Sequence, residues 1–461
     1  SWAEWKRPIV AIVLTFLCNV ESSMLAMGEW PYMSTIDEEA TASFFGYATA
    51  ANKAGHVLFA FIFAVWAHKI SSIKFPMLVG RCVTLIACVM YFFVEFIPSN
   101  RRWWMLFCYL LFGVGFGTSP LLRSYVARTT TEENRSTAYA LQNGAMVLSV
   151  IVGPIAQLSF AGLPYPGAFV IPPNIKLNIY TAPIWFACVT NVIAIVVTII
   201  WLQDPQDEAV QEMSTDKPTF SIAAIKERLA RLRTLNLPWP LIGLVLFEKM
   251  VSGLFNSTMP AIAGPLLTAM FALPGQSIVL LMGIAQILVS DWIHSWGGSS
   301  KSATHNHRVS CRVLFVFSNL VVIASYVITF PYPFVSSPLQ PYNATTRTGC
   351  NPLEYSWCDS QMVMSIYPFI IALTICSSFA LPSAAMSLDT IYSKMIGNID
   401  QNVMQSAFVI ADDIIQIVGP IYGSAVFTAI GINYINIING IVYIAGTVLW
   451  LAAWRWLKPY N

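Results

Sequence analysis

Charged residues are scarce in this chain, since Asp, Glu, Lys and Arg make up only 10% of its 461 residues. The basic residues are scattered rather than gathered in a patch with interleaved aromatic side chains, which argues against a nucleic-acid partner. Hydrophobic residues reach 56%, which is more apolar surface than a soluble core of ordinary proportions can bury. The sequence therefore predicts a protein whose surroundings are a lipid bilayer.

The sequence patterns of catalysis and metal binding are also missing. We find no phosphate-binding glycine loop, no cluster of metal ligands, and no nucleophile with a base at a meaningful spacing. His294, His305 and His307 lie in a polar segment without a nearby cysteine, which is typical of a solvated loop. We therefore expect no enzyme, no catalytic residues, no cofactor and no bound metal.

Cysteine is rare in the polar segments of the chain. Seven of the nine cysteines fall in or beside apolar stretches, where a thiol serves as a small packing group. Cys350 and Cys358 instead lie eight residues apart in a polar segment, just after the glycosylation sequon Asn343-Ala344-Thr345. This arrangement predicts a disulfide and a glycosylated Asn343 on an oxidising, luminal or extracellular side.

Long apolar runs are abundant. A helix needs about 20 apolar residues to cross the hydrocarbon core of a bilayer. Twelve stretches meet this requirement: 8–27, 43–67, 76–97, 103–127, 135–161, 179–202, 238–262, 274–295, 311–330, 363–393, 401–430 and 434–455. The predicted fold class is therefore an all-α membrane protein with twelve transmembrane helices.

The distribution of Lys and Arg predicts the orientation, because these residues are enriched in cytoplasmic loops. With the N-terminus inside, seventeen of the 25 Lys and Arg residues fall on the cytoplasmic side. The opposite side receives four of them, together with the sequon and the cysteine pair. Both termini are therefore expected in the cytoplasm.

The longest polar connection divides the chain into two halves. We expect a six-helix bundle at 1–202, a cytoplasmic linker at 203–237 and a second six-helix bundle at 238–461. Within the linker, Ile222, Ile225, Leu229 and Leu232 have the spacing of an amphipathic helix that lies on the membrane surface. The segments 123–154 and 389–420 form a faint repeat, since each begins with a charge and ends in Gly-Pro. The halves are thus expected to be pseudo-symmetric.

Twelve spans in two related halves, with both ends inside, are typical of a secondary transporter of the major facilitator superfamily. Along nearly its whole length the chain resembles the lysosomal major facilitator proteins of the neuronal ceroid lipofuscinosis type. The pieces that carry this resemblance are Trp30-Pro31-Tyr32, Arg123-Ser124-Tyr125, Phe247-Glu248, Gly349-Cys350, Trp357-Cys358 and Tyr392-Ser393-Lys394. The resemblance implies a lysosomal or endosomal membrane, and relatives of this kind are linked to the movement of chloride and other anions. We expect the protein to be a monomer.

The chain departs from the superfamily at two places. The turn after the second span reads Val65-Trp66-Ala67-His68-Lys69, without the acid of the usual Gly-x-x-x-Asp-Arg motif. Tyr109 stands before the glycines of the fourth span, where many proton-coupled members carry an arginine. Proton coupling by that arginine is therefore not expected.

Ionisable residues within the spans are candidates for the transport path, because each costs roughly 2.5–3.5 kcal/mol at the bilayer centre unless it is paired or hydrated. At about 1.5 Å per helical residue, most of them fall near the midplane. The residues expected to bind substrate or to couple transport are Glu21, Lys53, His56, Glu248, Lys249, Ser252, Asn256, Asp412 and Asp413. Under the arrangement that the resemblance implies, they meet in one polar chamber; alternatively, they form structural pairs that hold the halves together.

Arg123 and Asp389 occupy equivalent places in the repeat, about five residues from the inner ends of their spans. They are predicted to pair across the cytosolic mouth as a gate, although each side chain could instead extend to the membrane interface.

The sequence thus favours a transporter that moves a small solute by alternating access. The substrate expected from the resemblance is an anion or organic anion, although the acidic residues suit a cation or zwitterion equally well. A protonated carboxyl of the Asp412 and Asp413 pair could couple transport to a proton gradient. An anion channel on the same fold and a receptor or scaffold without transport remain alternatives.

Overall fold

The computed structural model describes residues 2–171, 175–204, 238–288, 310–396 and 401–460. Within these ranges, eleven helices are long and apolar enough to cross a membrane, and Gly275–Leu288 is a shorter apolar helix at the position of the predicted eighth span. The helical membrane fold is therefore confirmed, although the described residues contain eleven rather than twelve helices of spanning length. The linker helix predicted at 222–232 and the three histidines His294, His305 and His307 lie outside the described residues.

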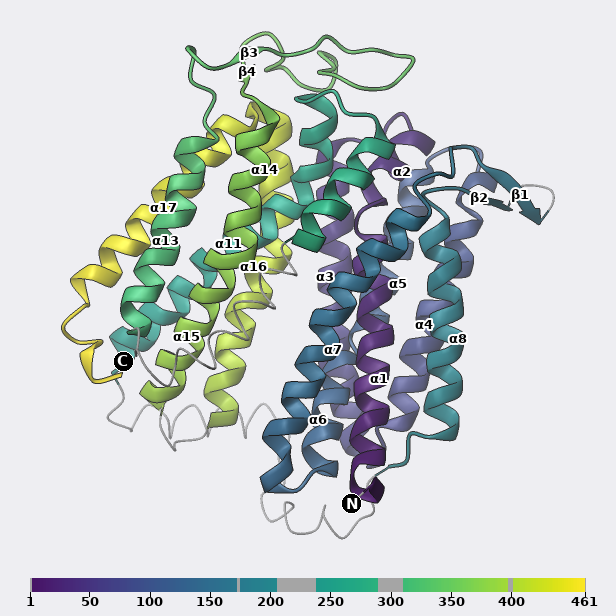
Figure 1. The fold of residues 1–461 in the computed structure, drawn as a ribbon, viewed down its shortest axis with the longest axis vertical. Coiled ribbons are helices and arrows are strands. Elements are labelled where there is room, and N and C mark those ends of the chain that lie inside the picture. The colour runs from purple at the N-terminus through teal and green to yellow at the C-terminus, as the bar shows by residue number, and fades with distance from the viewer. Residues whose placement is uncertain (1, 172–174, 205–237, 289–309, 397–400, 461) are drawn as a thin grey trace.

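The long helices fall into two bundles of packed helices (Figure 1). The first bundle contains α1 (Trp2–Leu25), α3 (Ala42–Ile70), α4 (Lys74–Phe92), α5 (Arg101–Phe116), α6 (Ser119–Thr129), α7 (Glu132–Ser159) and α8 (Ala182–Ile200). The second contains α11 (Trp239–Ala269), the Gly275–Leu288 helix, α13 (Cys311–Ile328), α14 (Ile366–Ile375), the π-helical turn η2 (Cys376–Ala380), α15 (Leu381–Ile396), α16 (Gln401–Ile430) and α17 (Ile432–Ala452).

Glycines let the helices of the first bundle approach closely. A Cβ atom on Gly113 of α5 would lie 2.0 Å from the carbonyl oxygen of Asn52 in α3. One on Gly117, just after α5, would lie 2.8 Å from the backbone nitrogen of Ala60. Because small residues are what allow membrane helices to pack backbone against backbone, these glycines bring α3 against α5.

Short elements lie at the helix ends. The short helix α2 (Glu29–Ile36) lies between α1 and α3 and was not predicted from the sequence. The strands β1 (Ala168–Ile171) and β2 (Ile175–Leu177) form one antiparallel pair, and β3 (Ser337–Pro338) and β4 (Met362–Val363) form another. The 3₁₀ turns are η1 (Val94–Phe96) and η3 (Lys458–Tyr460).

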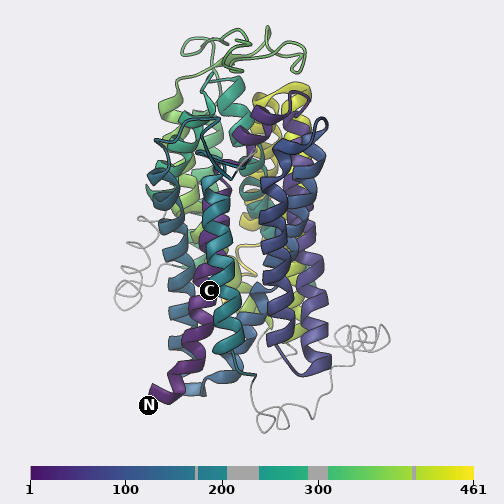
Figure 2. The ribbon, with the colours of Figure 1, turned by 90° about the vertical axis from the view of Figure 1, so that its right-hand side faces the viewer.

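The segment 331–365 covers one end of the molecule, which we call the loop side; the opposite end, where the N-terminus lies, is the terminus side (Figures 1 and 2). Cys350 and Cys358 in this segment are joined by a disulfide. Asn343 is exposed nearby, in a turn where its side-chain oxygen accepts a hydrogen bond from the backbone N–H of Thr345. The sequon is therefore accessible on this side.

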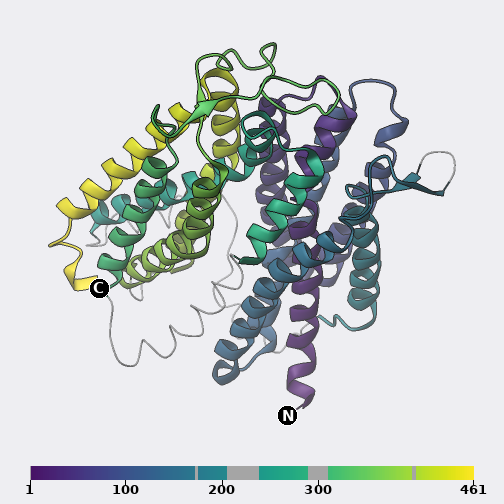
Figure 3. The same cartoon turned by 45° about the horizontal axis from the view of Figure 1, so that its top comes forward.

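Hydrogen bonds join the two bundles on the loop side. The indole N–H of Trp30 donates to the Thr268 hydroxyl at 3.1 Å, and the Ser43 hydroxyl donates to that of Thr428 at 2.8 Å. The backbone N–H of Ala42, at the start of α3, donates to the carboxylate of Glu354 at 3.2 Å. The ribbons diverge toward the terminus side (Figures 1 and 3). The loop side is therefore the closed side in this conformation.

Gly264 of α11 offers a test of this closure. A Cβ atom there would lie 2.7 Å from side-chain atoms of Trp30 in the other bundle, so Gly264→Val should push the bundles apart on the loop side. With a Thr49→Cys probe in the space between the bundles, we expect labelling by an impermeant maleimide added on the loop side to rise severalfold. Gly243→Val on the same helix is the control, because nothing lies within 4 Å of a Cβ atom at Gly243. Equal labelling in the two variants would contradict the closure.

Candidate functional site: a cavity between the bundles

A cavity of about 400 Å³ lies between the two bundles and is lined by both of them. The first bundle contributes residues of α1, α2, α3 and α5, and the second contributes residues of α11, the Gly275–Leu288 helix, α14, η2 and α15. This volume is within the range of pockets that hold drug-sized molecules. The cavity is therefore the candidate solute site.

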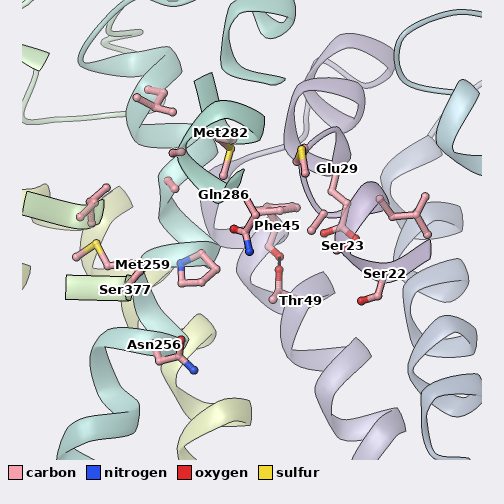
Figure 4. Close-up of a pocket in the computed structure, with 18 of the residues that line it drawn as sticks. Ser22, Ser23, Glu29, Phe45, Thr49, Asn256, Met259, Met282, Gln286 and Ser377 are labelled. Carbon is pink, nitrogen blue, oxygen red and sulfur yellow. Dashed lines mark hydrogen bonds between the residues drawn. The ribbon is translucent and has the colours of Figure 1, made fainter. Parts of the chain in front are cut away.

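Glu29 and Lys53 are the charged residues that line this cavity. Figure 4 shows Glu29 among the lining residues. α1 ends at Leu25, and the chain restarts as α2 at Glu29, so the break between the helices presents the Glu29 side chain to the cavity. Lys53 faces the cavity from α3, as the sequence analysis proposed. Glu29 lies outside the spanning helices and is partly buried. Burial raises the pKa of its carboxyl to about 7, although the Lys53 ammonium opposes this shift.

Three further predicted residues surround Lys53 without lining the cavity. Asp412 and Asp413 of α16 lie within electrostatic range of its ammonium group. Asp412 also packs against α11, since a Cβ atom on Gly253 would lie 3.4 Å from its Oδ1 atom. His56 is partly buried in α3 and within electrostatic range of Lys53. Lys53 is thus shared among three carboxyl groups from both bundles.

The wall from the second bundle carries neutral polar groups among apolar side chains. Asn256 of α11, Gln286, Thr374 and Ser377 are its polar members, and Ser377 projects from the π-helical turn (Figure 4). Within the described residues, no three His, Cys, Asp or Glu side chains come together as metal ligands. The wall can therefore hydrogen-bond a solute without contributing a charge.

The predicted polar stripe of α11 reaches the cavity only at Asn256. A step of four residues turns a helix by about 400°, so Asn256 lies about 80° around the axis from Glu248. Glu248 and Ser252 are buried within the second bundle and do not line the cavity. A Cβ atom on Gly446 of α17 would lie 2.8 Å from a Glu248 oxygen, and neither carboxyl oxygen has a hydrogen-bond partner among the described residues. Glu248 therefore lies outside the predicted chamber.

Glu21 also lies outside the chamber, because α1 turns its side chain into the first bundle. It is 1% exposed and forms an ion pair with Arg81 of α4, whose Nη1 atom lies 3.0 Å from Glu21 Oε1. Asn191 of α8 donates to the other carboxylate oxygen, and Arg81 also donates to the Gly115 carbonyl of α5 at 2.9 Å. This cluster joins four helices of the first bundle, so it does not hold the two halves together.

Lys249, Asp389 and Arg123 lie away from the cavity lining. The ammonium of Lys249 lies 3.8 Å from Asp389 and 4.7 Å from the centre of the Phe408 ring, all within the second bundle. Arg123 is exposed and lies over the Tyr139 ring at 5.4 Å. The predicted ion pair of Arg123 with Asp389 is therefore not formed among the described residues, although the Arg123 guanidinium lies within electrostatic range of Asp389.

The sequence analysis missed Glu29 and Arg81 for different reasons. Arg81 lies inside the predicted span 76–97, so its charge indicated a buried partner, but its predicted depth of about 7.5 Å differs from the roughly 20 Å of Glu21 and did not identify that partner. Glu29 follows the predicted end of the first span, and no periodicity marks the helix break that turns it inward. Such a break can be recognised only from the packing of the neighbouring helices.

Comparisons with known proteins agree with this architecture. The family model described as Major Facilitator Superfamily matches residues 13–346. The chain is 21% identical over 464 residues to major facilitator superfamily domain-containing protein 8 of Xenopus laevis, which covers 94% of this chain and 88% of that protein. Among solved structures, it resembles a D-xylose–proton symporter with a TM-score of 0.64 and 10% identity, covering 97% of each chain. It also resembles a bacterial homologue of the human lysosomal transporter Spinster, in an inward-facing and occupied conformation, with a TM-score of 0.63 and 10% identity, covering 99% of this chain and 97% of that one.

Proposed function

The chain belongs to the Major Facilitator Superfamily, and from that premise we propose that it is a secondary transporter that carries a small organic anion by alternating access. The observation that carries the proposal is Lys53, a cation that faces a cavity between two bundles already joined on one side. The two bundles, proposed at 1–202 and 238–461 with a linker at 203–237, would rock about this cavity.

We assign the loop side to the lumen of a lysosome or endosome and the terminus side to the cytosol. The positive residues of the sequence, the accessible Asn343 sequon and the Cys350–Cys358 disulfide support this orientation, with Asn343 glycosylated. The similar Spinster homologue is described as inward-facing, which matches a loop side that is closed. Closure of the terminus side would then bring Arg123 toward Asp389 as the cytosolic gate.

Proton coupling follows from the charges around Lys53. When Glu29 is ionised, its carboxylate competes with a solute anion for the Lys53 ammonium. When Glu29 holds a proton, this competition is removed and an anion can bind. Asp412 and Asp413 also act on Lys53, and His56 lies within electrostatic range of its ammonium group. Tyr91 of α4 and Tyr109 of α5 lie within electrostatic range of Glu29. Anion and proton would therefore bind together and cross together.

Counterflow in proteoliposomes tests the carrier. Vesicles preloaded with unlabelled naphthalene-2-sulfonate should accumulate the labelled anion transiently, and the initial rate should saturate with concentration. A conductance far above carrier turnover, without counterflow, would instead identify an anion channel on this fold. Absence of both anion flux and anion binding would leave a receptor or scaffold.

Glu29→Gln should remove the pH dependence of anion binding. A group with a pKa of about 7 is about 90% protonated at pH 6 and about 10% protonated at pH 8, so wild-type affinity should fall about tenfold over this interval. Glutamine at position 29 cannot ionise, and the variant should keep high affinity at both pH values to within about twofold. The control is Glu39→Gln, which removes an exposed carboxylate on the loop side. A tenfold fall that persists in Glu29→Gln would assign the proton to another group.

A further inference from the structure

The two walls of the cavity differ in chemistry. Both charged lining residues, Glu29 and Lys53, belong to the first bundle, where Ser22, Ser23 and Asn52 stand beside them. The second bundle contributes only neutral side chains to the described lining. A solute that fills this space therefore meets charge on one wall and, on the other, an uncharged surface in which apolar side chains surround a few polar groups.

The apolar part of the cavity lining is larger than the surface that an inorganic ion can contact. Met259, Leu267, Met282, Phe369 and Leu373 face the cavity from the second bundle. A cavity of about 400 Å³ has much more room than a single inorganic anion needs. An ion bound at Lys53 would leave this wall facing water, whereas an apolar group would remove it from water.

Aromatic rings approach the same space from both bundles. Phe45, Phe112 and Phe116 line the cavity from the first bundle, and Phe255 and Phe369 line it from the second. Aromatic side chains favour stacked or edge-to-face contact with another ring. The lining is therefore suited to a flat or branched apolar body.

We propose that the solute is an amphiphilic organic anion, with its anionic group at Lys53 and an aromatic or branched apolar body against the wall of the second bundle. This inference rests on the transport function proposed above and specifies its substrate class. Inorganic anions and sugars are expected to be poor substrates, because neither has an apolar body to cover that wall.

A series of sulfonates tests the class at constant charge, since sulfonates remain ionised throughout the working pH range. Binding to the purified full-length protein is measured at pH 6 for methanesulfonate, benzenesulfonate and naphthalene-2-sulfonate, and flux is measured in proteoliposomes for each of them and for chloride. Burying one methylene is worth about 0.8 kcal/mol, or roughly fourfold in affinity. We therefore expect at least a tenfold rise in affinity across the series.

Leu373→Thr locates the apolar body. This change on the cavity wall should weaken naphthalene-2-sulfonate about fivefold and leave methanesulfonate unchanged. Ile371→Thr on the outer face of α14, where the side chain is 58% exposed, should affect neither anion. The sulfonate series measured on the wild-type protein tests the substrate class even if Leu373→Thr fails to fold.

The outcomes separate the two proposals. Equal affinity and flux for chloride, methanesulfonate and naphthalene-2-sulfonate would overturn the amphiphilic class and leave anion transport standing. Failure to bind or move any of these anions would overturn both proposals. Preference for an amphiphilic ammonium ion over the sulfonates would assign the charge recognition to Glu29 and overturn the proposed class.

Discussion

Arg81→Met is expected to destabilise the first bundle by about 3–5 kcal/mol, the usual cost of removing one partner of a buried ion pair. The change leaves the Glu21 carboxylate at 1% exposure without its ion-pair partner, and among the described residues Asn191 and Thr190 remain as its hydrogen-bond donors. It also removes a hydrogen bond to the Gly115 carbonyl. The measurement is the thermal unfolding midpoint and the folded yield of purified protein in detergent.

Removing both charges separates pairing from packing. The double variant Glu21→Gln with Arg81→Met should recover a large part of the loss, because no charge is then left buried. Arg128→Met is the control, since Arg128 is exposed and a surface charge of this kind contributes about 0–1 kcal/mol. An Arg81→Met midpoint equal to that of wild type would show that the cluster does not hold the four helices together.

The fold could be predicted from the sequence because lipid imposes one dominant requirement on the chain. Every spanning segment needs a long apolar helix. Such segments can be recognised from the apolar composition of the sequence, without knowledge of how the helices pack. The predicted span 43–67 corresponds to α3 (Ala42–Ile70), and the span 434–455 corresponds to α17 (Ile432–Ala452). The break that creates α2 was missed because it depends on contacts with other helices rather than on hydropathy.

The site could be predicted only in part because depth in the membrane does not determine direction. Lys53, Glu21 and Glu248 were selected by the same criterion, their charge inside a span, yet only Lys53 faces the cavity. Glu21 has a cationic partner in a neighbouring helix, and Glu248 packs against a glycine. Which way a charge points is decided by the side chains and helix spacing around it, and these require coordinates.

Lys53→Met is expected to lower organic-anion flux about 10- to 100-fold at pH 6. A hydrogen bond to a charged group contributes about 1.5–3 kcal/mol, and this range corresponds to that loss in affinity. Lys69→Met provides the control, because Lys69 is exposed near the end of the same helix. Lys53→Arg should retain part of the flux, since it keeps the charge at this wall. The measurement is the initial rate of labelled naphthalene-2-sulfonate uptake into proteoliposomes.

A second substitution distinguishes two roles of Lys53: binding the solute anion, or neutralising the neighbouring carboxyl groups as a structural partner. If Lys53 only neutralises Glu29, the double variant Lys53→Met with Glu29→Gln should regain both stability and flux. If Lys53 binds the solute, that double variant should regain stability while its flux remains low, because no cation is left to hold the anion. Restoration of flux in the double variant would therefore contradict the anion site, and a stable protein with low flux would support it.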